Sequence, residues 1–369
     1  MNDESRSFFT AADSPSTPPT PPGVTPTDGA EVTTRRDVWL KLTLVFAITA
    51  LLLGLHILLP LAAVRIAQIA NPAFLQRSEA VYLLDLVPFY VIAVPLCAFL
   101  LTRLPQQRPE RRAMSVGSYI GWLCVGLTFV AAGNLVGQAI TGIISAFTGH
   151  ETTSANDLLG VGNVWWALLF IGVLAPIFEE IIFRKFLIDA LRRYGEGTAI
   201  LLSALVFGLA HGNFTQCFYA FGLGLVLGVL YCRTGRSLLS ILPHMILNTC
   251  STLLSFFVLP KLTFLYDLDS VAVEEMFDSL LSVLPALLIF GLYTAAFYGG
   301  ALAGLILIIL RAKKWRPVRS SLLLEAPAGG FYHPLTGRDV RVALAKSPGF
   351  WLMIAVSACL FVLSVIPLS

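Results

Sequence analysis

The sequence predicts an all-α fold, a polytopic bundle of about eight to nine transmembrane helices. Hydrophobic residues make up 56% of the chain and charged residues 13%, and the mean hydropathy is +0.79. A soluble globular domain has about 25% charged residues, and a soluble fold of 369 residues could not bury this much apolar surface. In addition, apolar runs of about 20 residues, enough to cross the hydrocarbon core, recur along the chain.

The first 37 residues differ in composition from the rest of the chain. They are rich in Pro, Ser, Thr and Gly, as in SPSTPPTPPGVTPTDG, and such segments lack the apolar side chains needed to fold. Residues 1–37 are therefore expected to form a disordered cytoplasmic tail. Because the first apolar run starts late and is too long for a signal peptide, it is expected to remain as a signal anchor.

About nine apolar segments follow, two of them short for a full span. They are Lys41–Val64, Val81–Leu101, Tyr119–Phe147, Val164–Leu187, Thr198–His211, Phe218–Cys232, Leu238–Leu259, Leu280–Leu310 and Phe350–Leu368. We divide the chain into N-terminal transmembrane helices (38–150), a core segment (151–262) that carries the polar motifs described below, and C-terminal transmembrane helices with a basic cytoplasmic loop (263–369).

Basic residues fall in alternate loops, which is the positive-inside pattern. They are Arg35, Arg36, Lys41, Arg103, Arg108, Arg111, Arg112, Lys185, Arg192, Arg193, Arg233, Arg236, Arg311, Lys313, Lys314, Arg316 and Arg319. This predicts an integral membrane protein, in the plasma membrane if bacterial, with a cytoplasmic N-terminus and the C-terminus outside. The basic loop 312–349 could lie against anionic lipid, but we favour an ordinary cytoplasmic loop that obeys the charge rule.

The first polar group within the apolar helices is the segment APIFEEIIFRKF. Glu180 and Arg184 are four residues apart, so they share one helix face and can pair. Glu179 is turned by about 100° from Glu180, so it faces elsewhere. Two adjacent carboxylates in a low dielectric repel each other, which favours a proton on one of them and suits a general acid or base. A solvated charge cluster at the end of the helix is the alternative.

Two further segments each carry a histidine with a partner four residues away. Phe207 and His211 lie in LVFGLAHGNFTQ, and His244 and Asn248 lie in SILPHMILNTC. Taken alone, each histidine would be a hydrogen-bonded core residue or a contact between helices. His56, His150 and His333 have no comparable company and are assigned no role.

The expected depth brings these residues together. If Trp165 lies at the outer interface, Glu179 is about 21 Å inward at 1.5 Å per residue, in a core of about 30 Å. His244 follows Arg236 from the cytoplasmic side and lies about 10 Å deep at the same rise per residue. Three helices can therefore present two Glu, two His and one Asn in one layer near the cytoplasm.

In order and spacing these motifs resemble those of the CPBP family, the CAAX proteases and bacteriocin-processing enzymes also called Abi proteins. Glu179-Glu180-Ile-Ile-Phe-Arg184 is similar to the EExxxR motif of the family, Phe207 to His211 to FxxxH, and His244 to Asn248 to HxxxN. The resemblance covers about residues 164–259. It implies an intramembrane endopeptidase, a hydrolase that cleaves a membrane-associated peptide or protein substrate such as a CAAX-type or bacteriocin-like peptide.

The resemblance also implies roles for the residues. Glu179 and His211 would activate the attacking water, His244 and Asn248 would stabilise the oxyanion, and Glu180 and Arg184 would support them. The family is often described as metallopeptidases, and Glu179, His211 and His244 could bind zinc. The need for a metal is left open, because the sequence has no HExxH.

Two other readings remain. The polar cluster could lock the helices of a non-catalytic scaffold or immunity protein, or bind a cation in a transporter. A transporter would more often show matched halves, which the sequence lacks. The partners expected are the lipid bilayer and a membrane-associated substrate, with no nucleic acid.

Overall fold

The structure is a computed structural model that describes residues 31–149, 163–262, 273–311, 317–325 and 332–366. The helices and strands are β1 Val32–Thr33, α1 Arg35–Ala70, η1 Pro72–Gln76, α2 Ala80–Pro88, η2 Phe89–Ala93, α3 Val94–Thr102, α4 Val116–Thr148, α6 Val164–Ala167, η3 Leu168–Leu174, α7 Ala175–Glu180, η4 Ile181–Ile188, α8 Asp189–Leu191, η5 Arg192–Tyr194, α9 Glu196–Ala210, α10 Phe214–Thr234, α11 Leu238–Phe257, α12 Leu259–Leu262, α13 Val273–Arg311, β2 Leu323–Glu325, β3 Tyr332–Pro334, α14 Gly337–Ala345 and α15 Pro348–Leu363.

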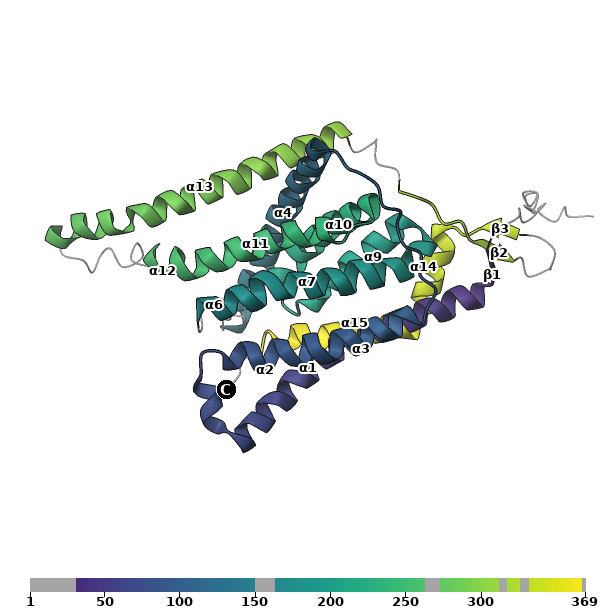
Figure 1. The fold of residues 1–369 in the computed structure, drawn as a ribbon, viewed down its shortest axis with the longest axis horizontal. Coiled ribbons are helices and arrows are strands. Elements are labelled where there is room, and N and C mark those ends of the chain that lie inside the picture. The colour runs from purple at the N-terminus through teal and green to yellow at the C-terminus, as the bar shows by residue number, and fades with distance from the viewer. Residues whose placement is uncertain (1–30, 150–162, 263–272, 312–316, 326–331, 367–369) are drawn as a thin grey trace, which may run out of the picture.

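The described residues contain seven helical segments that are long and apolar enough to cross a membrane. The pair α14 and α15, bent by 64°, would make an eighth. The short segment predicted at 198–211 is α9, which has only 15 residues and falls below the length of a full span. The predicted all-α, polytopic membrane bundle is confirmed, and most helices run along the long axis of the molecule (Figure 1).

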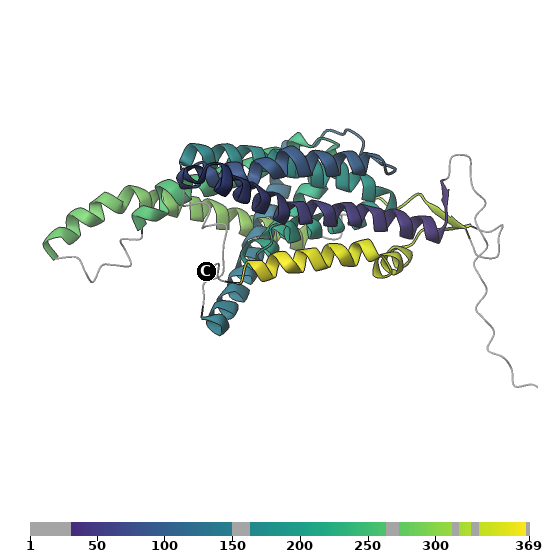
Figure 2. The same ribbon diagram turned by 90° about the horizontal axis from the view of Figure 1, so that it is seen from below.

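Helix α10 lies at the centre of the bundle, between α4 and α9. In its most apolar window 61% of residues are buried, against 11% for α13, which packs on α4 at the periphery. On the opposite side of the core, α1 packs along α15 and against α3, and the purple α1 and the yellow α15 run side by side in the view from below (Figure 2). Helix α13 therefore offers most of its surface to lipid, whereas α10 supports the core.

Close packing of α4 on α10 depends on glycine. A Cβ atom added to Gly133 would lie 2.5 Å from the backbone of Phe218, and one added to Gly137 would lie 2.7 Å from the carbonyl oxygen of Thr215. Small residues let two membrane helices approach to backbone contact, where dispersion forces associate them without a hydrophobic driving force.

Wide π-helical turns interrupt the regular α-helical spans at three places, η2, η3 and η4. The segment η2 ends shortly before Pro95, and η3 ends shortly before Pro176. Proline has no N–H, so the carbonyl one turn earlier loses its partner and the ladder of hydrogen bonds shifts. Such turns are frequent at functional sites, and the third, η4, follows Glu180 directly.

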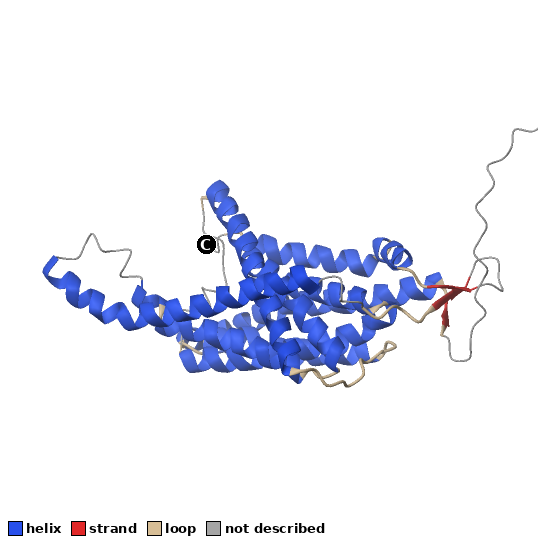
Figure 3. Ribbon diagram, turned by 90° about the horizontal axis from the view of Figure 1, so that it is seen from above, coloured by secondary structure: helices blue, strands red, loops and turns tan. Residues whose placement is uncertain are grey.

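A small sheet closes one end of the molecule, drawn red in Figure 3. Strand β1 pairs in parallel with β2, joining Val32 to Leu323, and β2 pairs antiparallel with β3. Residues 31–37, which the sequence placed in the disordered tail, thus form β1 and the first turn of α1, because a distant strand supplies their hydrogen bonds. The rest of that tail lies outside the described residues.

The predicted loop 312–349 is also more structured than the sequence indicated. It contains β2, β3 and α14, and α14 begins with a capping box between Thr336 and Asp339. Asp339 also lies 3.8 Å from Arg35, at the start of α1. The alternation of apolar residues in these strands is too short to stand out from the surrounding loop in the sequence.

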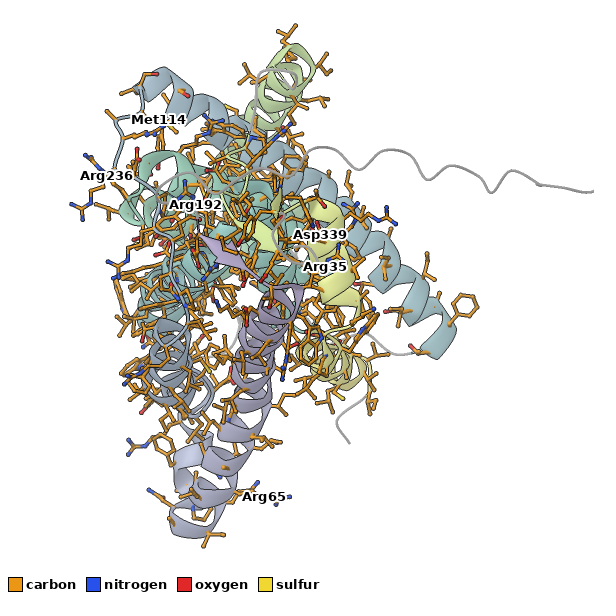
Figure 4. The ribbon with its side chains drawn as sticks, turned by 90° about the vertical axis from the view of Figure 1, so that its right-hand side faces the viewer. Arg35, Arg65, Met114, Arg192, Arg236 and Asp339 are labelled. Atoms are coloured by element: carbon orange, nitrogen blue, oxygen red, sulfur yellow. The ribbon has the colours of Figure 1, made fainter. Side chains whose placement is uncertain are left out.

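The loops predicted to be cytoplasmic meet at this same end (Figure 4). The backbone N–H of Gln107 donates to the carbonyl of Asp189, and that of Arg112 donates to the carbonyl of Thr234. The N–H of Glu196 donates to the carbonyl of Val318. One end of the bundle therefore carries the basic loops, as the positive-inside pattern requires of a single membrane face.

Candidate active site

The polar residues predicted from the sequence come from three neighbouring parts of the bundle. Glu179 and Glu180 end α7, and Arg184 lies in η4, which continues the same span. His211 follows the last residue of α9, and His244 and Asn248 lie in α11. Helix α11 packs against both η3 and α7, which brings His244 to the two carboxylates.

Glu180 and Arg184 form a fully buried ion pair. Nε and Nη2 of Arg184 donate to the two carboxylate oxygens of Glu180 at 3.1 and 3.3 Å, and both side chains are 0% exposed. Nη1 donates to Oγ of Ser203 at 3.0 Å, and the guanidinium carbon lies 4.8 Å from the centre of the Phe207 ring. Every charged atom of the pair is thus partnered, as a buried charge requires.

His244 lies between the two adjacent carboxylates. Its Nδ1 is 3.2 Å from Oε1 of Glu180, and its Nε2 is 3.6 Å from Oε2 of Glu179. Since the carboxylate of Glu180 is already neutralised by Arg184, the imidazole connects a closed ion pair on one side to Glu179 on the other. This connection fixes the orientation of the ring, because both nitrogens have a partner.

Glu179 is the carboxylate that a substrate or a water can reach. Its side chain is 18% exposed, whereas that of Glu180 is fully buried. The hydroxyl of Tyr90 donates to its Oε1 at 3.4 Å, and the Tyr90 ring stacks on Phe178 at 4.9 Å between centroids. One oxygen of Glu179 therefore faces a phenol and the other an imidazole, which leaves room for one further polar partner.

His211 stands beside this cluster, across the ring of Phe207. That ring packs edge-on against His211 at 5.0 Å and against His244 at 5.6 Å. Nδ1 of His211 lies 2.8 Å from the carbonyl oxygen of Phe207, an oxygen that only accepts. In the neutral ring the proton is therefore on Nδ1, and Nε2 is an acceptor.

Asn248 lies on the same face of α11 as His244, but its side chain hydrogen-bonds to a different part of the bundle. Its amide nitrogen donates to the carbonyl oxygen of Ile171 at 3.1 Å, and Thr249 next to it donates to the carbonyl of Gly172 at 3.4 Å. Both carbonyls belong to the π-helical turn η3. In this arrangement Asn248 satisfies backbone groups that an ordinary helix would pair internally.

The arrangement does not fit a bound metal ion. Across the described ranges no three His, Cys, Asp or Glu side chains are grouped as metal ligands. Of the three candidate ligands, His244 has both ring nitrogens directed at carboxylates, and His211 is separated from it by Phe207. Zinc needs three or four ligands about 2 Å from one point, so we derive no step through it.

The sequence missed two residues of the cluster, Tyr90 and Ser203. Tyr90 comes from η2, some 90 positions before Glu179, and Ser203 is the one polar side chain in an apolar stretch of α9. The hydroxyl of Ser203 accepts from Arg184 and donates to the carbonyl of Phe183. The signal available for Ser203 was a single hydroxyl in an apolar stretch, in a chain that also has an arginine within a neighbouring apolar span.

Comparison with known proteins finds relatives among membrane proteases and peptidases. Residues 161–250 match the family model for type II CAAX prenyl endopeptidase Rce1-like proteins. The chain is 24% identical over 215 residues to the membrane-embedded CAAX protease MroQ of Staphylococcus aureus (strain USA300), covering 54% of this chain and 85% of MroQ. It is 31% identical over 140 residues to the candidate membrane peptidase YdiL of Bacillus subtilis (strain 168), covering 37% of this chain and 56% of YdiL.

The aligned part of the chain thus spans little more than half the length of YdiL. No solved structure matches the chain. The matched family segment contains all six residues predicted from the sequence motifs, from Glu179 to Asn248. Over this segment the chain is similar to CAAX-type membrane proteases, which supports the resemblance of its motifs to those of the CPBP family.

Proposed function

We propose that the protein is an intramembrane endopeptidase that hydrolyses a peptide bond of a membrane-associated substrate. The observation that carries the proposal is Glu179, a partly exposed carboxylate held against His244 and Tyr90. The buried Glu180 and Arg184 beneath it supply a fixed electrostatic environment. A preorganised group of this kind is what a water-activating base needs, because it does not have to reorganise during the reaction.

In the proposed reaction a water bound at Glu179 loses a proton to the carboxylate as its oxygen attacks the peptide carbonyl. His211 can share this role, since its Nε2 accepts in the neutral ring. The proton then passes to the amide nitrogen as the C–N bond breaks, which releases an amine and a carboxylate. The oxyanion is assigned to His244 and Asn248. To reach it, Nε2 of His244 must turn from Glu179 and Asn248 must exchange its bond to Ile171.

The substrate class we favour is a CAAX-type prenylated C-terminus. The family model and the name of MroQ both refer to CAAX processing, and a prenyl chain would partition into the bilayer that surrounds the site. A bacteriocin-like leader peptide or another membrane-bound protein remains the competing substrate. We place the N-terminus and the end that carries the sheet in the cytoplasm, because the basic loops gather there.

The test is cleavage of a fluorogenic prenylated CAAX peptide by the purified protein in detergent. Wild type should cleave it, whereas Glu179→Gln and His211→Ala should each lose a factor of about 100 or more in kcat, the usual contribution of a general base. Thr49→Val is the matched control and should keep wild-type activity, since among the described residues the Thr49 hydroxyl bonds only to the carbonyl of Val45 in its own helix.

The same assay with a chelator tests zinc, because loss of activity that zinc restores would establish a metal. Cleavage by Glu179→Gln at the wild-type rate would refute the role of Glu179. If wild type cleaves neither the prenylated peptide nor a leader peptide, the fully partnered Glu180 and Arg184 pair would be better explained as the lock of a non-catalytic scaffold.

A further inference from the structure

Three polar side chains from outside the matched segment lie next to the candidate active site. They are His56 of α1, Asp85 of α2 and Tyr90 of η2, and we call them the N-terminal triad. The family model begins at residue 161, so neither the motifs nor the comparisons assign them a role. A histidine and an aspartate within apolar spans are costly and are retained mainly where they have partners or a function.

Tyr90 connects the triad to the catalytic carboxylate. Its hydroxyl donates to Oε1 of Glu179, and its ring, 5% exposed, is held between Phe178 and Phe89 with centroids at 4.9 and 5.3 Å. A phenol fixed on both sides presents its hydroxyl in one place. Tyr90 therefore sets the direction of the Glu179 carboxylate, whose other oxygen faces His244.

His56 connects the triad to the other side of the site. Its ring packs on Phe89 at 4.5 Å between centroids, and it interacts with the carbonyl oxygen of Ala210, the residue before His211. It also interacts electrostatically with His211 itself. In the part of the chain that the structure describes, Nδ1 of His56 is buried and has no hydrogen-bond partner.

Asp85 contributes the carboxyl group of the triad. Its carboxyl interacts electrostatically with His56 and with Tyr90, and it precedes Tyr90 by little more than one helical turn. A carboxylate acts on a nearby imidazole or phenol through its charge, even without a hydrogen bond between them. The charge of Asp85 can therefore act on both His56 and Tyr90.

We propose that the N-terminal triad is a positioning unit of the peptidase site. In it Tyr90 fixes Glu179, His56 supports Tyr90 through the ring of Phe89 and lies near the end of α9 that carries His211, and Asp85 acts on both rings through its charge. The proposal rests on the proposed peptidase function. It gives α1 and α2 a catalytic purpose besides membrane anchoring. It also gives a reason for the buried Nδ1 of His56, which has no hydrogen-bond partner among the described residues, since such a group in a native structure calls for an explanation.

The test compares Asp85→Asn, His56→Gln, Tyr90→Phe and the double variant His56→Gln/Asp85→Asn with wild type, with Thr49→Val as the control from α1. Each variant in the triad should lower kcat about 10- to 100-fold, as small misplacement of catalytic groups does, while KM stays within about twofold because substrate binding is retained. The double variant should be no slower than the slower single variant, because the two residues act as one unit.

Equal kcat in wild type and all three single variants would overturn the proposal, and so would a loss confined to KM. A second measurement does not need activity. The chain has five histidines, so removing each in turn assigns its ring ¹⁵N signals in the detergent-solubilised protein. Asp85→Asn should shift the signals of His56 and His211, and Thr49→Val should leave both in place.

Unshifted signals in Asp85→Asn would refute the triad even if the protein proves to be a peptidase. Conversely, shifted signals in a protein that cleaves no peptide would leave the triad intact and remove the proposed function. The two hypotheses therefore fail separately.

Discussion

Replacing Arg184 by methionine should separate the structural from the catalytic contribution of the buried ion pair. Methionine keeps much of the side-chain volume but removes the guanidinium, which bonds to Glu180 and Ser203 and lies over Phe207. Glu180 is only four residues away in the same span. The contact between Glu180 and Arg184 lies within one span and persists when the helices separate, so this contact contributes little to the free energy of unfolding in detergent.

The tertiary contacts of Arg184 do contribute to that free energy. A hydrogen bond between membrane helices, here to Ser203, contributes about 1 kcal/mol, and a desolvated cation over an aromatic ring contributes about 2 kcal/mol. Arg184→Met should therefore lower the free energy of unfolding by about 3 kcal/mol relative to wild type. The assay is equilibrium unfolding in mixed micelles, followed by the loss of tertiary fluorescence.

Ser203→Ala is the control, because it removes the hydroxyl with its bonds to Arg184 and to the carbonyl of Phe183 but keeps the guanidinium over Phe207. At about 1 kcal/mol for each bond, it should lower the free energy of unfolding by about 2 kcal/mol. Peptidase activity should fall in Arg184→Met well beyond the loss of folded protein, since Glu180 then has no cation to balance it beside His244. An unfolding free energy for Arg184→Met within about 0.5 kcal/mol of wild type, the usual range for surface substitutions, would refute the reasoning.

Two predictions concern glycines that permit close packing. Gly133→Leu should lower the free energy of unfolding by about 3 kcal/mol, since overpacking at a helix contact costs this much, whereas Gly142→Leu on the same helix has open space around it and should be neutral; equal melting temperatures in detergent would contradict this. Gly235→Ala should be more destabilising than Gly149→Ala by thermal unfolding. Both glycines have left-handed φ angles, of 63° and 71°, but only at Gly235 would the new Cβ lie within 2.6 Å of another backbone. Equal losses of stability in the two variants would show that only the strain of the left-handed backbone matters, about 1 kcal/mol for each variant.

The sequence predicted the parts of the site that depend on short spacing. Glu180 and Arg184 pair as the four-residue interval indicates, and His244 reaches the two carboxylates, as the estimate of depth requires. The relations between motifs were harder to predict. Phe207 was expected to accompany His211, but it also separates that histidine from His244, because the direction of a ring depends on how three helices pack.

Residues outside the motifs could not be found from spacing at all. Tyr90 and His56 reach the site through tertiary contacts made by α1 and η2, and nothing in their own segments distinguishes them from other half-buried polar residues. The sheet was not predicted from the sequence for a similar reason. Two or three residues of β1 and β2 are too few for a period-two pattern, and their pairing partner is far away in the sequence.

The contacts between α1 and the last described helices have a consequence for biosynthesis. The indole of Trp39 donates to the carbonyl of Lys346, 307 residues further along the chain, and α1 packs along α15. A membrane protein leaves the ribosome from its N-terminus, so α1 enters the bilayer long before its neighbour has been translated. During that interval the flank of the site that α1 and α15 cover together is incomplete. A site flanked in this way is complete only after α15 has been inserted beside α1.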